Sequence, residues 1–133
     1  MHKFINQAIK LAQNSYYENK IHFRHAAIIT RGASVISKGI NKAKRNAFVG
    51  IYSYHKNPGC DIHAEVDAIL RARKKSDLRG TRLFVARVSR TGVKISNSRP
   101  CPMCINVMQK HGIIKAYYSI NESEYGIIDL NKL

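Results

Sequence analysis

The stretch "PCPMCINVMQKHG", residues 100–112, sets two cysteines at the start of a helix pattern that ends at a glycine. Pro100 and Pro102 suit a first helical turn, which needs few backbone donors, and Gly112 is a typical C-terminal cap. Cysteines three residues apart lie about 60° apart around a helix, so both sulfurs can face one point. This pair alone fits a disulfide, a redox pair, or a structural or catalytic metal site.

A third candidate ligand lies upstream, in "HAEVDAIL", residues 63–70. His63 opens another helix pattern, and Glu65 follows two residues later. His63 with Cys101 and Cys104 gives three zinc ligands, whereas a structural zinc takes four; the open position for water is typical of a catalytic site. A carboxylate beside that position can take a proton from the water and pass it on. The conjunction of these residues favours a catalytic zinc site.

The rest of the chain alternates helix and strand patterns, which predicts an α/β fold with a mixed sheet. A long basic and aromatic loop is expected over residues 41–60. The segment between the last two strands is too short for a parallel crossover, so we expect that pair to be antiparallel. The predicted helices cover residues 3–20, 63–75 and 102–112, and the predicted strands cover residues 25–31, 34–40, 81–88, 113–120 and 126–130.

Length and cysteine usage narrow the class of protein. A chain of 133 residues is expected to form one domain, residues 1–133, with a core of its own. No apolar run approaches the ~20 residues that a membrane-spanning helix needs, so no membrane partner is expected. Three cysteines do not complete a disulfide framework, which predicts an intracellular, cytoplasmic protein with free or metal-bound thiols.

The chain is strongly basic, with 23 Lys and Arg against 8 Asp and Glu, a formal charge of +15. Such an excess indicates a polyanionic partner, or else a surface that serves solubility. Aromatic residues that can stack on bases, Phe48, Tyr52 and Tyr54, are interleaved with the first of two basic clusters. These clusters, expected to flank one pocket, comprise Lys38, Lys42, Lys44, Arg45 and Lys56, and then Arg87, Arg90, Lys94 and Arg99.

The motifs His63-Ala64-Glu65 and Pro100-Cys101-Pro102-Met103-Cys104 resemble the H-x-E…P-C-x-x-C signature of the zinc-dependent base deaminases. The chain is similar to the cytidine and deoxycytidylate deaminase superfamily over most of its length. The resemblance implies a three-layer α/β/α sandwich with a mixed five-stranded sheet. It implies one Zn²⁺ per chain and, because relatives often form dimers or tetramers, a possible homo-oligomer.

The resemblance also implies roles for individual residues. His63, Cys101 and Cys104 would hold the zinc, and Glu65 would be the catalytic residue that moves protons. The backbone N–H of Ala64 would bond the base carbonyl, and Asn41 would contact the sugar. Basic residues near the predicted pocket are expected to bind the substrate's phosphates: Lys42, Lys44, Arg45 and Arg99.

The implied activity is hydrolytic conversion of cytosine to uracil, in a nucleotide or in single-stranded nucleic acid. One alternative is a tRNA-adenosine-type deaminase, since these enzymes share the HAE tripeptide and a Met corresponding to Met103. Asp67 departs from the deoxycytidylate deaminases, which usually carry Asn at that position. Another alternative is a non-catalytic zinc-containing module that binds nucleic acid, which would have no use for Glu65.

Overall fold

The computed structural model describes residues 1–15, 23–42 and 62–133. Its main sheet has the strand order β2-β1-β3-β5-β6, and a two-residue strand, β4 (Ile95–Ser96), pairs with β3. The five long strands are β1 (Phe23–Arg31), β2 (Ser34–Ile40), β3 (Arg82–Ser89), β5 (Lys115–Ser119) and β6 (Tyr125–Asp129). Strands β3 and β5 are parallel, and the other pairings are antiparallel.

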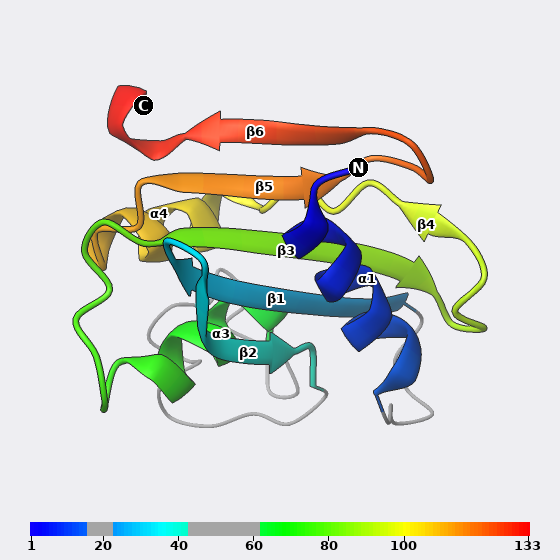
Figure 1. Ribbon diagram of the computed structural model, residues 1–133, viewed down its shortest axis with the longest axis horizontal. Coiled ribbons are helices and arrows are strands. Elements are labelled where there is room, and N and C mark those ends of the chain that lie inside the picture. Colours follow the sequence, from blue (N-terminus) through cyan, green and yellow to red (C-terminus); the bar gives the residue numbers. More distant parts are fainter. Residues whose placement is uncertain (16–22, 43–61) are drawn as a thin grey trace.

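Helices lie on both faces of this sheet (Figure 1). Helix α1 (Lys3–Asn14) packs on one face, and α3 (Ala64–Ala72) and α4 (Pro102–Lys110) lie on the other. The chain ends in a short 3₁₀ helix, η1 (Leu130–Lys132). The three-layer α/β/α sandwich with a mixed sheet is therefore confirmed.

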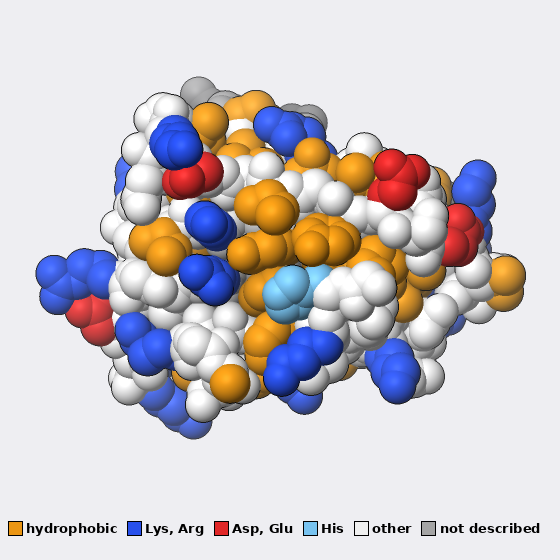
Figure 2. Space-filling model, turned by 45° about the horizontal axis from the view of Figure 1, so that its top comes forward, with side chains coloured by type: hydrophobic (Ala, Val, Ile, Leu, Met, Phe, Trp, Pro, Cys, Tyr) orange, Lys and Arg blue, Asp and Glu red, His pale blue; other side chains and the backbone are white. Residues whose placement is uncertain are grey.

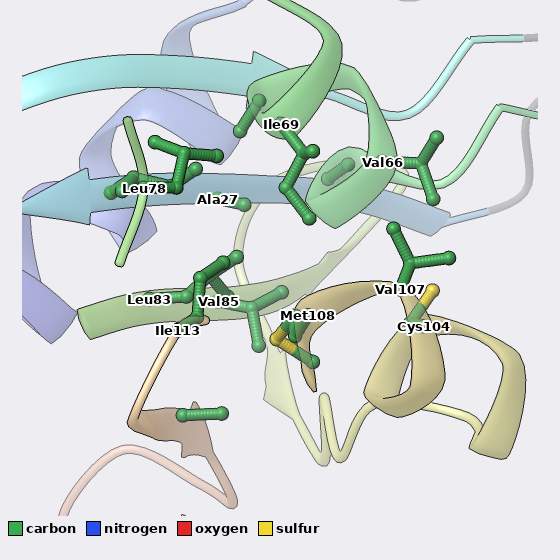
Figure 3. Packing of buried hydrophobic residues seen from close by; sticks show 14 of the residues in the cluster. Ala27, Val66, Ile69, Leu78, Leu83, Val85, Cys104, Val107, Met108 and Ile113 are labelled. Atoms are coloured by element: carbon green, nitrogen blue, oxygen red, sulfur yellow. The ribbon is translucent and has the colours of Figure 1, made fainter. Parts of the chain in front are cut away.

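The helices pack their apolar residues against the sheet. On α1 the buried residues recur every three or four positions, as Phe4, Ile5, Ala8, Ile9 and Ala12. Figure 3 shows α3 and α4 contributing side chains to one core, with Val66 from α3, Val107 from α4, and Leu83 and Val85 from β3. None of the described helices is long and apolar enough to cross a membrane.

The predicted antiparallel pairing of the last two strands is confirmed, with Tyr118 opposite Gly126. Helix α4 ends where expected, because Gly112 follows it with a φ of 77°, a left-handed conformation that favours glycine. The sheet contains one short strand more than predicted, β4, which is only two residues long.

The topology gathers several chain segments at one edge of the sheet. The carboxyl ends of β3 and β5 lie there because these strands are parallel. The start of β1 and the end of β2 lie there too, because β1 is antiparallel to both β2 and β3. Ligands of α/β proteins bind at such carboxyl edges.

Candidate active site

Two of the predicted ligands occupy the N-cap positions of helices. His63 caps α3 and Cys101 caps α4, and neither side chain makes a capping hydrogen bond. Ser, Thr, Asp and Asn are the usual residues at such positions, since their oxygens accept from the first-turn N–H groups. The two side chains instead approach each other, and the positive ends of both helix dipoles favour negatively charged thiolates there.

The three side chains form a compact nitrogen and sulfur cluster. Nδ1 of His63 lies 3.1 Å from Sγ of Cys104 and 3.6 Å from Sγ of Cys101, and all three ligand atoms lie within 4.8 Å of one another. A tetrahedral zinc with ordinary bond lengths separates its nitrogen and sulfur ligands by about 3.6 Å. The donor set and its spacing therefore fit zinc, and the chain binds one zinc ion through this cluster.

The two thiols titrate very differently. The hydrogen bond from Cys104 lowers the pKa of Cys101 to about 4, and His63 contributes in the same direction. That shared hydrogen bond and burial raise the pKa of Cys104. The lowered pKa of Cys101 favours its thiolate, the form that binds metal.

Glu65 is buried next to this cluster, with 5% of its surface exposed. Burial raises the pKa of its carboxyl group, while the nearby His63 opposes that shift. Glu65 lies in the first turn of α3, two residues from His63, so the same helix turn positions the ligand and the carboxyl group. A buried carboxyl with a raised pKa can both take and return protons.

A cavity of about 240 Å³ opens beside the cluster. Among the residues predicted from the sequence, those that line it are Asn41, His63, Ala64, Glu65, Arg99 and Cys101. Lys42 is engaged elsewhere, because its ammonium pairs with Asp67 at 3.1 Å. Lys44 and Arg45 fall outside the described residues.

Asn41 is held by hydrogen bonds to the start of β1. Its Oδ1 accepts from the backbone N–H of His25 at 2.8 Å, and its Nδ2 donates to the carbonyl of Phe23 at 2.8 Å. Each of these amide atoms keeps one further hydrogen-bonding capacity. Asn41 thus faces the cavity in a fixed orientation.

Two cavity residues were not predicted, His25 and Ser98. Burial, with a smaller effect of the charge on Arg87, lowers the pKa of His25 to about 4, so its imidazole is neutral at physiological pH. Ser98 is buried, and its Oγ lies 2.9 Å from both Val85 O and Ser119 Oγ. These bonds fasten the segment that precedes Cys101 to the middle of β3 and to the end of β5.

Arg99 is held against the hairpin of β5 and β6. Its Nη1 donates to the hydroxyl of Tyr118 at 3.1 Å, and the guanidinium lies 5.5 Å from the centre of that ring. The Tyr118 ring in turn lies against Gly126, where a Cβ atom would overlap it. A glycine at position 126 therefore leaves the space for the ring that orients Arg99.

Comparisons with known proteins agree with this site. Residues 1–120 match the family model described as the cytidine and deoxycytidylate deaminase zinc-binding region. Among curated protein sequences, none matches the chain significantly.

Solved structures of deaminases share the fold. The cytidine deaminase of Burkholderia pseudomallei is 19% identical, with a TM-score of 0.69 over 99% of this chain and 94% of that one. The dCMP deaminase of cyanophage S-TIM5, in complex with dCMP and dUMP, is 21% identical, with a TM-score of 0.59 over 87% and 77%. The match of the family model across the cap histidine, the buried glutamate and the paired cysteines means that the chain belongs to the cytidine and deoxycytidylate deaminase family and is a zinc-dependent deaminase.

Proposed function

We propose that this deaminase converts cytosine to uracil in a nucleotide or in single-stranded nucleic acid. The observation that carries the proposal is the buried carboxyl of Glu65, which lines the same cavity as His63 and Cys101. The S-TIM5 enzyme, whose structure contains dCMP and dUMP, supports a pyrimidine nucleotide as the substrate.

The chemistry needs one Lewis acid and one proton carrier. Zinc held by His63, Cys101 and Cys104 supplies Lewis-acid activation of a water molecule. Glu65 takes one proton from the attacking water and gives it to ring nitrogen N3. Glu65 then moves the second proton from the new C4 hydroxyl to the amino group, which leaves as ammonia. One water is consumed, and C4 gains a carbonyl as its bond to nitrogen breaks.

Other residues in the cavity would orient the substrate. The backbone N–H of Ala64 belongs to the first turn of α3, where N–H groups have no partner within the helix, and it can bond the base carbonyl. Asn41 keeps a donor and an acceptor for sugar hydroxyls. These contacts would hold the base next to Glu65 in an orientation that allows proton transfer.

Arg99 is the one lysine or arginine among the described residues that line the cavity. Because Lys42 is paired with Asp67, Arg99 is best placed to bind a phosphate of the reacting nucleotide. Lys and Arg also occur at several places on the face shown in Figure 2. Basic charge alone therefore does not locate the substrate, and cavity residues carry the assignment.

The test incubates the purified, zinc-loaded protein with dCMP, CMP, cytidine, single-stranded DNA and tRNA, and measures the turnover of each substrate. Glu65→Gln should keep its zinc and fold while losing at least the roughly 10²- to 10⁴-fold that general acid–base catalysis provides. Arg99→Gln should raise KM for phosphorylated substrates and leave cytidine unaffected.

Three results would contradict the proposal. If the protein converts adenosine to inosine in tRNA and deaminates no cytosine, its substrate base is adenine. Full activity of the Glu65→Gln variant would show that Glu65 is not the proton carrier. Nucleic-acid binding without turnover of any substrate would indicate a non-catalytic module.

A further inference from the structure

Phe23 and Arg87 form a stacked pair at the edge of the sheet that carries the cavity. The guanidinium carbon of Arg87 lies 3.7 Å from the centre of the Phe23 ring. Phe23 is 40% exposed, which is unusual for a phenylalanine. The active-site chemistry described above uses neither side chain.

The strand register puts this pair next to the cavity. Arg87 on β3 lies directly opposite His25 on β1, and His25 lines the cavity. Phe23 is two residues before His25, so both side chains project from the same face of β1. The charge of Arg87 contributes to the lowered pKa of His25, which is consistent with their proximity.

The guanidinium of Arg87 lacks a protein counter-charge in the part of the chain that the structure describes. Its Nε is buried without a hydrogen-bond partner among those residues. None of the ion pairs between described residues includes Arg87. A guanidinium without a counter-charge attracts anions, so a ligand that brings a phosphate is favoured beside it.

We propose that Phe23 and Arg87 form a subsite for the nucleotide next to the one that is deaminated. The flanking base stacks on the exposed Phe23 ring, and the phosphate that joins the two nucleotides accepts from Arg87. This inference rests on the proposed function and deepens it, because a flanking subsite selects single-stranded oligonucleotides over free nucleotides. Stacking on one aromatic ring changes affinity by roughly 5- to 150-fold.

The decisive comparison uses four substrates that differ only around the reacting cytosine: dCMP, the trinucleotide TCT, and the two trinucleotides in which one or the other flanking base is replaced by an abasic site. Phe23→Ala should lower kcat/KM for TCT by at least roughly 5-fold and leave dCMP unchanged. Removing the flanking base on the correct side should abolish the difference between the wild type and Phe23→Ala. Phe23→Tyr, which keeps the ring, should retain the wild-type preference.

Arg87→Gln tests the phosphate contact. Its affinity for TCT should fall and should depend less steeply on salt, because one phosphate contact contributes roughly −0.7 to the slope of log affinity against log salt. Arg82→Gln is the matched control, because Arg82 is exposed on the same strand at its opposite end, and it should behave as the wild type. Circular dichroism checks that each variant folds.

Binding measurements separate the subsite from the chemistry. In a Glu65→Gln background, fluorescence anisotropy with labelled TCT should still show the loss caused by Phe23→Ala, even if the protein deaminates nothing. If that loss is absent, or if Phe23→Ala weakens dCMP as much as TCT, the flanking subsite is overturned. In the second case the pair contacts the reacting nucleotide itself.

Discussion

The two faces of the sheet are built from different kinds of residue. The α1 face is almost wholly apolar, with Phe4, Phe84 and Tyr117 at its centre. On the face covered by α3 and α4, the core adjoins the buried polar side chains of Glu65 and Asp67. Burying a polar group costs free energy unless it is paired, whereas burying an aromatic ring stabilises the fold. Apolar packing on the α1 face therefore offsets the free energy that burying polar groups costs on the other face.

The zinc ligands should give the largest effect. Cys104→Ser replaces a buried thiol, which would bind zinc as a thiolate, by a hydroxyl that rarely ionises. Zinc affinity should fall by more than the roughly 10- to 100-fold typical of outer-shell changes, and activity should be lost with it. Metal analysis of the purified protein measures this. Met103→Leu, between the two cysteines, conserves volume and should keep one zinc per chain; equal zinc content in both variants would exclude Cys104 as a ligand.

The centre of the α1 face should affect stability alone. Phe84 is 2% exposed and stacks on Tyr117 with ring centres 4.4 Å apart, so Phe84→Ala should lower the free energy of unfolding by about 3–5 kcal/mol. Zinc content and activity per folded molecule should not change, because neither Phe84 nor any residue of α1 lines the cavity. Urea unfolding measures the first quantity.

The control for Phe84→Ala is Val93→Ala, because Val93 is 80% exposed, and stability should then change by no more than about 0.5 kcal/mol. A loss of zinc binding by folded Phe84→Ala protein would show that the two faces are not separable.

Gly39 tests how closely β2 and α3 pack. A Cβ atom there would lie 2.5 Å from the carbonyl oxygen of Ala64 and 2.9 Å from the Cα of Ala68. Gly39→Ala should destabilise by about 1–3 kcal/mol through overpacking and should lower kcat, because the displaced turn carries Glu65. Thermal unfolding and initial rates measure both effects. Ser34→Ala, exposed on the same strand, should change neither; unaltered kcat in Gly39→Ala would mean that α3 tolerates the shift.

The smallest effect on stability is expected at an exposed ion pair of α3, on the face of the sheet that carries the cavity. The Arg71 side chain is 57% exposed and pairs with Asp67 at 3.1 Å. Arg71→Ala should change the free energy of unfolding by less than about 1 kcal/mol, since exposed ion pairs contribute little and Lys42 still bonds Asp67. Lys74→Ala, at an exposed position three residues later in the chain, is the control. A loss above about 2 kcal/mol in urea unfolding would show that Asp67 needs both partners.

The zinc cluster could be predicted because its signals are local. Cys101 and Cys104 share one helical turn, and Glu65 lies two residues from His63, so helix geometry sets each arrangement. That the two motifs meet in space was implied by the resemblance to deaminases. The helices and strands followed from periodicity, while β4, at two residues, is too short for any pattern.

The other parts of the site depend on contacts between distant segments. His25 stands in a stretch that predicts only a strand, and its place in the cavity follows from the register of β1 against β3. Lys42 belongs to a basic cluster in the sequence, but α3 brings Asp67, 25 positions away, against it. Ser98 and Ser119 meet across 21 positions. A single sequence contains no signal for such pairings.

One pair of backbone hydrogen bonds has a consequence for how this enzyme can diversify. The N–H of Lys42 donates to the carbonyl of Ile62 at 2.9 Å, and the N–H of Ile62 donates to the carbonyl of Lys42 at 2.7 Å. This bridge joins the two ends of residues 43–61 immediately before His63. Loop-closure entropy rises slowly with length, with each doubling costing only about 0.6 kcal/mol. A change in the length of the interval between Lys42 and Ile62 should therefore cost little stability, while the bridge keeps His63 in register.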